Sequence, residues 1–521
     1  MTLAISDREC LSFGDALFLY LERDGMPLHV ASLCIFDGNL TLNALRRQIK
    51  GRLSEVPRFQ HKVVPPAWIF GVPTWERDAD FRIENHIREV RLRRGDQPEL
   101  QKRAQEILST RLERHRPLWD MTLFTHLQEN KSAVLLRVHH SVADGISGVE
   151  LMKVIMDRSP DPRSSGSRKK EAGAAPFTHA GSRVLESMAS SVFYNIDRIL
   201  NAESELLTFA QQVVANGTHE TDKDHDNDKV HGPLLDELRN MAPESLSATE
   251  PLPFNVVCRG PQKFVWAEIP FNEIRAVKRH FGTTVNDVVL ALVASIVGGY
   301  LRAHHVASDK RLLRVVIPVS SRSRAQNGDL GNRISFVPVS VPLGKTSVPK
   351  LLDDVHERTQ LLKNTKLAEL IAFCGTMMGV IPTPLQAFLG PLVSQLPLNL
   401  CNLICTNVPG PPEPLYIAGH RLVACYPYVP IGGTMGMNCA VLTYNGKAFF
   451  GFTGDVNGIP DLELLPTLLA SSFAKLYKCV PVTRTTSKKK APTRIVETAT
   501  RRPPRATTAE PVRAMAMTAA G

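Results

Sequence analysis

The hydrophobic pattern of the first 157 residues alternates between the period of a strand and the period of a helix. The segments with strand character are residues 28–36, 121–127 and 132–139, and those with helical spacing are residues 42–53, 99–112 and 146–156. Strands and helices that alternate along a chain pack in layers around a shared core. Residues 1–157 are therefore predicted to form a mixed α/β domain.

A second stretch of the same kind runs from residue 251 to residue 480. Its predicted strands are residues 264–269, 312–319, 334–341, 403–407, 421–426, 437–444 and 448–452, which together complete one sheet, and its predicted helices are residues 271–281, 351–366 and 462–476 and a helix capped by Thr284. The apolar run 288–301 in the capped helix spans about 14 residues, too few to cross a bilayer. This stretch is predicted to be a second α/β domain.

Two polar regions flank the second domain. Residues 158–250 are polar at both ends and helical in spacing at 179–215, so they are predicted to be a crossover linker. The net charge is +11, and the segment from Cys479 to Gly521 holds nine Lys or Arg against two Glu. Rich also in Pro, Thr and Ala, residues 481–521 are predicted to be a disordered basic tail. The tail could touch anionic lipid or remain solvated without a partner, and the body is not expected to bind nucleic acid.

The cysteines and the N-terminus point to a reducing compartment. Nine cysteines are scattered without a Cys-x-x-Cys pair, and residues 1–10 lack an apolar signal segment. A cytoplasmic protein is expected, with peripheral contact to a membrane or lipid inclusion left open. The reason is the segment 370–412, which has no charged side chain, is broken by prolines at 382, 384, 391 and 397, and suits either a core or a lipid-docking surface.

The candidate chemistry lies where the strand 132–139 meets the following helix. His139 and His140 are followed by Asp144 and Gly145, in the pattern His-His-x-x-x-Asp-Gly. Because strand side chains alternate, His140 is expected on the face of Val134, Leu136 and Val138, and His139 on the other. A neutral imidazole in a dry pocket can take a proton from an alcohol or a thiol. A structural histidine is the usual alternative, and a metal site is disfavoured because no further ligands stand at useful spacing.

Several further motifs accompany this one in a fixed order. They are Leu11-Ser12 with Asp15, Phe18 and Glu22; Pro57-Arg58-Phe59; Arg116-Pro117-Leu118-Trp119; Thr284 to Ala291, with the sequence TVNDVVLA; Pro318-Val319-Ser320 with Arg322; Gly331-Asn332; Asn407-Val408-Pro409-Gly410-Pro411; and Asn438 before Tyr444-Asn445-Gly446. From about residue 8 to 478 the chain resembles bacterial wax ester synthase/acyl-CoA:diacylglycerol acyltransferases. That family belongs to a wider group with chloramphenicol acetyltransferase-like and condensation domains.

The resemblance implies a fold and a reaction. Two chloramphenicol acetyltransferase-like α/β domains would enclose an active-site tunnel. There an acyl group would pass from acyl-CoA, a co-substrate rather than a cofactor, to diacylglycerol or a long-chain fatty alcohol. His140 would act as general base without an acyl-enzyme, a contribution of roughly 10²–10⁴-fold in rate. An oxyanion donor is required but is not assigned.

The supporting residues carry weaker expectations from the same resemblance. His139 would support the loop or position substrate. Asp144 would pair with an arginine, with Arg322 as one candidate, and Gly145 would leave room for the pantetheine arm. Asn286 and Asp287 stand in the first turn of a helix, where capping and dipole compensation are the alternatives to a role in the site. Pro117-Leu118-Trp119 would pack in the core or the tunnel wall.

Two other functions remain open from the sequence. One is an acyltransferase of the same wider group that acts on a polyketide alcohol or a carrier-protein thioester. The other is a lipid-droplet or membrane-surface protein that has lost catalysis, which the intact motif disfavours.

Overall fold

The computed structural model describes residues 8–66, 72–142, 148–161, 249–320, 334–344, 347–363 and 401–481. Met1–Val480 forms one compact unit and Pro481–Gly521 a second, and every element below belongs to the first unit. The expected linker helix at 179–215, most of the basic tail and residues 370–400 of the uncharged segment lie outside the described residues.

The N-terminal half is built on a six-stranded mixed sheet with the order β12-β13-β2-β7-β6-β5. Its strands are β2 (His29–Asp37), β5 (Ile87–Arg91), β6 (Trp119–Leu127), β7 (Lys131–His139), β12 (Tyr416–Ile417) and β13 (His420–Tyr428). Beside it stands a three-stranded antiparallel sheet of β1 (Arg8–Cys10), β4 (Thr74–Arg77) and β3 (His61–Val64). The helices of this half are α1 (Phe13–Leu21), α2 (Leu42–Arg52), α3 (Gln97–Leu108) and α4 (Gly148–Ile155).

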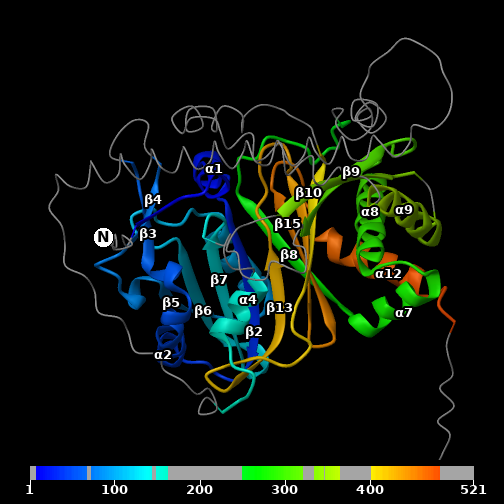
Figure 1. The fold of residues 1–521 in the computed structure, drawn as a ribbon. Helices are drawn as coiled ribbons and strands as arrows, with labels where there is room; N and C mark the ends of the chain where they lie inside the picture. The colour runs from blue at the N-terminus through cyan, green and yellow to red at the C-terminus, as the bar shows by residue number, and fades with distance from the viewer. Residues whose placement is uncertain are drawn as a thin grey trace, which may run out of the picture. The chain divides into compact units, whose positions relative to one another are not determined.

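The C-terminal half is built on a second six-stranded sheet with the order β10-β9-β11-β14-β15-β8. Its strands are β8 (Gln262–Pro270), β9 (Leu312–Ser320), β10 (Ile334–Pro342), β11 (Leu403–Pro409), β14 (Met437–Tyr444) and β15 (Lys447–Asp455). Four helices gather on one side of this sheet (Figure 1), namely α7 (Phe271–Phe281), α8 (Val285–Ala303), α9 (Val348–Lys363) and α12 (Leu464–Tyr477). The two mixed sheets with their helices confirm the expected α/β class.

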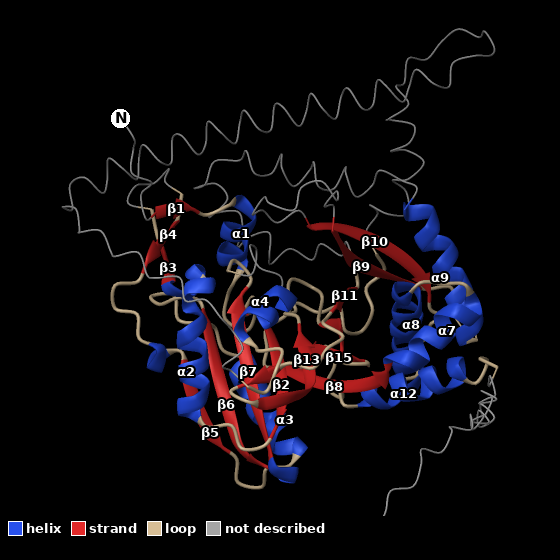
Figure 2. Cartoon of the chain, turned by 60° about the horizontal axis from the view of Figure 1, so that its bottom comes forward, coloured by secondary structure: helices blue, strands red, loops and turns tan. Residues whose placement is uncertain are grey.

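One strand crosses between the halves, and here the sequence-based assignment was wrong. Residues 421–426 were expected in the second sheet, but β13 pairs with β2 of the first sheet, with Cys425 opposite Cys34. Figure 2 shows β13 between β2 and β15. A second connection is made by α3, where Gln105 donates to the Phe264 carbonyl of β8 over 3.1 Å. The two halves of the chain are thus joined by the pairing of β13 with β2 as well as by the contact of α3 with β8.

Helix α8 forms the centre of the C-terminal core. Thr284 caps it as expected, and a capping box with Asp287 fixes its first turn. The helix is 19 residues long, so the expected length of about 14 residues was too short. In length and composition it is the one helix of the described residues that could cross a membrane, but 72% of its apolar window is buried inside the fold. Helix α8 is therefore a core helix.

Candidate active site

Strand β7 carries the two histidines to the centre of the N-terminal sheet. It lies between β2 and β6, and every residue after Lys131 is buried. Val134, Leu136 and Val138 belong to one apolar cluster, whereas Ala133 and Leu135 belong to another that reaches α3 and β8. The expected alternation of faces is thereby confirmed. The strand ends at His139, so His140 lies in the turn that follows.

His140 is held from two sides and is partly exposed. Its backbone N–H donates to the Leu28 carbonyl over 2.9 Å. The ring of Phe18 stacks on its imidazole, with ring centroids 3.8 Å apart and planes inclined by 17°. Nδ1 is buried and has no hydrogen-bond partner among the described residues.

The environment of His140 favours the neutral imidazole. Burial is the largest cause, and the positive charge that His139 can carry acts in the same direction. The residue's own backbone carbonyl acts against them, and the pKa of His140 falls to about 4. At neutral pH the ring is therefore unprotonated and can accept a proton.

His139 is enclosed, with 1% of its surface exposed. Its Nδ1 accepts hydrogen bonds from the backbone N–H of Ser141 at 3.2 Å and the Ser141 hydroxyl at 2.7 Å. A nitrogen that accepts from a backbone N–H carries no proton, so a neutral His139 must be protonated at Nε2. Nε2 lies 3.5 Å from Oε1 of Glu22 and makes no hydrogen bond among the described residues. This ring is too enclosed to reach a substrate.

Glu22 is a buried acid whose importance the sequence did not reveal. Its Oε1 accepts from the Leu28 N–H at 3.1 Å, and its Oε2 accepts from Arg114 at 3.0 Å. Burial alone would raise the pKa of Glu22, but His139, Arg114 and Leu28 outweigh it and bring the pKa to about 2. The carboxylate is therefore charged throughout the range in which the protein works. Glu22 was noted only as part of an N-terminal motif.

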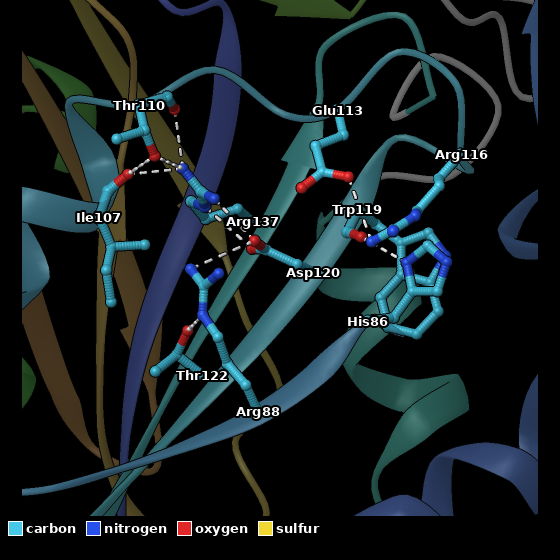
Figure 3. A network of polar contacts seen from close by, with 10 residues as sticks. All are labelled: His86, Arg88, Ile107, Thr110, Glu113, Arg116, Trp119, Asp120, Thr122 and Arg137. Carbon is cyan, nitrogen blue, oxygen red and sulfur yellow. Dashed lines mark hydrogen bonds and ion pairs between the residues drawn. The ribbon is translucent and has the colours of Figure 1, made fainter. Parts of the chain in front are cut away.

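A buried ion pair fixes β7 just ahead of the histidines (Figure 3). Arg137 lies opposite Asp120 of β6 and meets it with two hydrogen bonds, of 2.9 and 2.6 Å. The same guanidinium donates to the carbonyls of Ile107 and Thr110, at the end of α3. Arg88 adds a contact of 3.6 Å to Asp120 and donates to Thr122. This network ties strand β7, strand β6 and helix α3 together two residues before His139.

The Pro117-Leu118-Trp119 motif packs in the core and hydrogen-bonds to the backbone of β7. The Leu118 carbonyl accepts from the His139 backbone N–H over 2.9 Å. Trp119 is 1% exposed, stacks between Phe59 and His86 and donates from Nε1 to the Phe59 carbonyl over 2.8 Å. Figure 3 shows His86 against Trp119. The motif therefore packs in the core, as expected, and its backbone supports the first histidine.

His29 is a third buried histidine, which sequence reasoning did not single out. It lies opposite His139 in the pairing of β2 with β7, and neither of its ring nitrogens has a hydrogen-bond partner among the described residues. Burial is the largest cause that lowers the pKa of His29 well below its usual value, and the charge of Arg137 and any positive charge on His139 act in the same direction. His29 is therefore neutral at physiological pH, and it stacks on Tyr428 from β13.

The remaining predicted residues divide into two groups. Asp144, Gly145 and Arg322 lie outside the described residues, so their expected roles stay predictions. Asn286 is exposed at the start of α8 and accepts from Asn407 of β11 at 2.5 Å. Asp287 is buried and joins α8 to α9. Its carboxylate accepts from the Thr284 N–H, from His356 at 2.7 Å and from Thr359 at 2.7 Å.

The contacts of Asp287 predict a large effect on stability. Burial would raise the pKa of Asp287, but the hydrogen bonds from His356, Thr284 and Thr359 outweigh it and lower the pKa. We expect Asp287→Ala to reduce the free energy of unfolding by about 2–3 kcal/mol, because three donors lose their acceptor. Urea unfolding measures this difference. Glu357→Ala, at an exposed position of α9, is the control and should change it by less than about 0.5 kcal/mol.

Comparisons with known proteins identify the family. A family model for the wax ester synthase/diacylglycerol acyltransferase catalytic domain matches residues 11–289, and the model of the corresponding C-terminal domain matches residues 330–477. A Mycobacterium tuberculosis protein named probable diacylglycerol O-acyltransferase tgs1 is 26% identical over 472 residues, covering 88% of this chain and 94% of that protein.

Two solved structures share the fold. The wax ester synthase/diacylglycerol acyltransferase from Marinobacter aquaeolei VT8 aligns with a TM-score of 0.59 at 20% identity, over 90% of this chain and 98% of that one. A starter condensation domain of rhizomide synthetase, solved in complex with C8-CoA, aligns with a TM-score of 0.50 at 11% identity, over 90% and 94%. Because the catalytic-domain match alone spans more than half of the sequence and includes both histidines, the chain belongs to the wax ester synthase/diacylglycerol acyltransferase family and is an acyltransferase.

Proposed function

We propose that this acyltransferase transfers a fatty acyl group from acyl-CoA to the hydroxyl of diacylglycerol or of a long-chain alcohol, with His140 as general base. One observation carries the proposal. Of the two motif histidines, His140 is the one that is both partly exposed and neutral, with a pKa of about 4. His139 is enclosed and uses its Nδ1 to accept from Ser141.

The reaction follows from a neutral imidazole beside a thioester. Because Nδ1 of His140 is buried, Nε2 is the atom that can meet the acceptor hydroxyl. Nε2 takes the hydroxyl proton while the oxygen attacks the thioester carbonyl. The new C–O bond forms, the C–S bond breaks, and the proton passes from the imidazolium to the leaving thiolate. Ester and free CoA are the products, with no acyl-enzyme and no resident cofactor.

The source of the substrates follows from their chemistry. Diacylglycerol and long-chain alcohols are poorly soluble in water, so the acceptor would be drawn from a membrane or lipid-droplet surface. The condensation domain in complex with C8-CoA, which shares the fold, is consistent with a thioester donor of the CoA type.

The test is a reconstituted reaction. The purified chain is incubated with palmitoyl-CoA and either diolein or hexadecanol, and lipid products are identified by thin-layer chromatography and mass spectrometry. Free CoA is measured with a thiol reagent. We expect triacylglycerol or wax ester, with one CoA released per ester. Release of CoA without ester, or turnover only of a carrier-protein thioester, would contradict the proposal.

A further inference from the structure

The two motif histidines are both held by one short helix, α1. Phe18 of this helix stacks on His140, and Glu22, its C-cap, faces His139. Residues four apart lie on the same side of a helix, and the Glu22 N–H still donates to the Phe18 carbonyl, so both side chains point to the same turn. The end of α1 is therefore fixed against both histidines.

Glu22 is also connected to the backbone of His140 by two hydrogen bonds that share Leu28. Its Oε1 accepts from the Leu28 N–H at 3.1 Å, and the Leu28 carbonyl in turn accepts from the His140 N–H at 2.9 Å. Leu28 is thus clamped between the carboxylate and His140. A shift of Glu22 would move the backbone from which the His140 ring projects.

The buried carboxylate of Glu22 forms an ion pair with Arg114, whose side chain is partly exposed to solvent. The Glu22 side chain is 1% exposed, whereas that of Arg114 is 48% exposed. Arg114 donates to Oε2 of Glu22 at 3.0 Å and to the Leu19 carbonyl of α1 at 2.7 Å. A buried carboxylate with one exposed partner is expensive to keep for stability alone, because desolvation offsets much of the ion-pair energy. Its position beside the motif points to a role in the reaction.

We infer that Glu22 is a positioning residue of the acyltransferase site. Its carboxylate favours a proton on Nε2 of His139, in addition to the Ser141 hydrogen bond to Nδ1, and through Leu28 it fixes the backbone of His140. The inference rests on the proposed role of His140 as base. A carboxylate behind a histidine commonly sets which nitrogen carries the proton and how the ring is oriented. Here that effect is indirect for His140, because His139 and Leu28 lie between.

Two substitutions of Glu22 distinguish the effect of its charge from the effect of its side-chain length. Glu22→Gln keeps the shape and removes the charge, and Glu22→Asp keeps the charge but shortens the side chain by one methylene. We expect Glu22→Gln to lower kcat by about 10²-fold with little change in KM, since a misplaced base slows the chemical step more than it weakens binding. Glu22→Asp should recover part of the loss. The surface control is Glu106→Gln, whose partner Arg103 is exposed, and it should match the unsubstituted chain.

A second readout does not depend on activity. In protein labelled with ¹⁵N-histidine, the ring nitrogen shifts report which nitrogen carries the proton. We expect His139 to show the Nε2–H form in both proteins, because the Ser141 N–H donates to Nδ1 in each, and the Nε2 resonance to shift in Glu22→Gln, where the neighbouring negative charge is lost. If the unsubstituted chain makes no ester, the proposed function fails, while the spectrum still decides whether the charge of Glu22 acts on the His139 ring.

The inference is overturned if Glu22→Gln keeps the original kcat and the original His139 spectrum while His140→Ala is inactive. Should Glu22→Gln fail to fold, Arg114→Met takes its place, because that substitution removes the ion pair without emptying a buried position. We then expect kcat to fall several-fold at constant KM. An unchanged kcat in folded Arg114→Met would also overturn the inference.

Discussion

His140→Ala is expected to abolish ester formation from acyl-CoA while leaving the protein folded. Removal of a general base lowers the rate by about 10²–10⁴-fold, equivalent to roughly 3–5 kcal/mol of transition-state stabilisation. The imidazole contributes little to packing, since it is partly exposed and its main contact is one stacked ring, Phe18. Its loss should change the free energy of unfolding by about 1 kcal/mol or less.

The measurement is kcat for the reconstituted reaction, with circular dichroism to establish that the variant is folded. His115→Ala serves as the matched control, because this imidazole is 69% exposed and pairs only with Glu113 among the described residues. The control should keep full activity. If folded His140→Ala retained most of the activity, the base would have to be another group.

The second large effect is expected on stability, for Arg137→Met. This change leaves Asp120 with only the 3.6 Å contact to the exposed Arg88, and it removes the Arg137 hydrogen bonds to the carbonyls of Ile107 and Thr110. Breaking a buried pair from one side destabilises a protein by about 3–5 kcal/mol, because the other charge remains desolvated. We expect a loss of this size in urea unfolding followed by circular dichroism.

Two further variants sharpen this prediction. Arg103→Met removes an exposed arginine that pairs with Glu106, and it should cost about 1 kcal/mol or less. The double variant Asp120→Leu with Arg137→Met removes both charges and should regain part of the stability that the single variant loses. A loss below about 1 kcal/mol for Arg137→Met would mean that the pair is not the anchor of β7.

The local elements of the fold were predictable because each depends on nearby residues. Helix α7 begins and ends at the predicted residues, since its apolar period runs up to Gly282, which adopts the left-handed conformation that ends the helix. Strand β7 and its two faces were likewise predictable from alternation alone. The cap of α8 was predictable from Thr284, which stands directly before the apolar period of the helix, whereas the reciprocal hydrogen bond to Asp287 was seen only in the structure.

The pairing of distant strands was not predictable from these patterns. The alternation in β13 is the same whether the strand joins β2 or a neighbour from its own half, and nothing local specifies the choice. The Arg137–Asp120 pair was hidden for the same reason, since it depends on the register of β6 against β7. Glu22 was hidden because about 117 residues separate it from His139, and only the fold brings them together.

The candidate site was also predictable only in part. The motif identified His140 from sequence and resemblance, because its spacing is local. What decides between the two histidines is structural: the different exposure of the rings and the Ser141 hydrogen bonds to His139. The expected tunnel remains a prediction.

The pH dependence of the reaction tests the neutral imidazole most directly. The rate should fall at low pH, because the base must be unprotonated to act. A pKa of about 4 for His140 keeps the imidazole unprotonated at every higher pH. We measure kcat/KM for the acceptor alcohol between pH 4 and 8. The donor is an acyl-pantetheine thioester without phosphate groups, so that no substrate phosphate titrates in this range, and intrinsic fluorescence checks folding at each pH.

The account predicts a rate that stays flat from pH 8 down to about 5 and falls to half near pH 4. An imidazole in water would instead lose half of the rate near pH 6.5. An acid limb at that higher pH in the folded protein would contradict the claim that a dry, neutral His140 takes the proton.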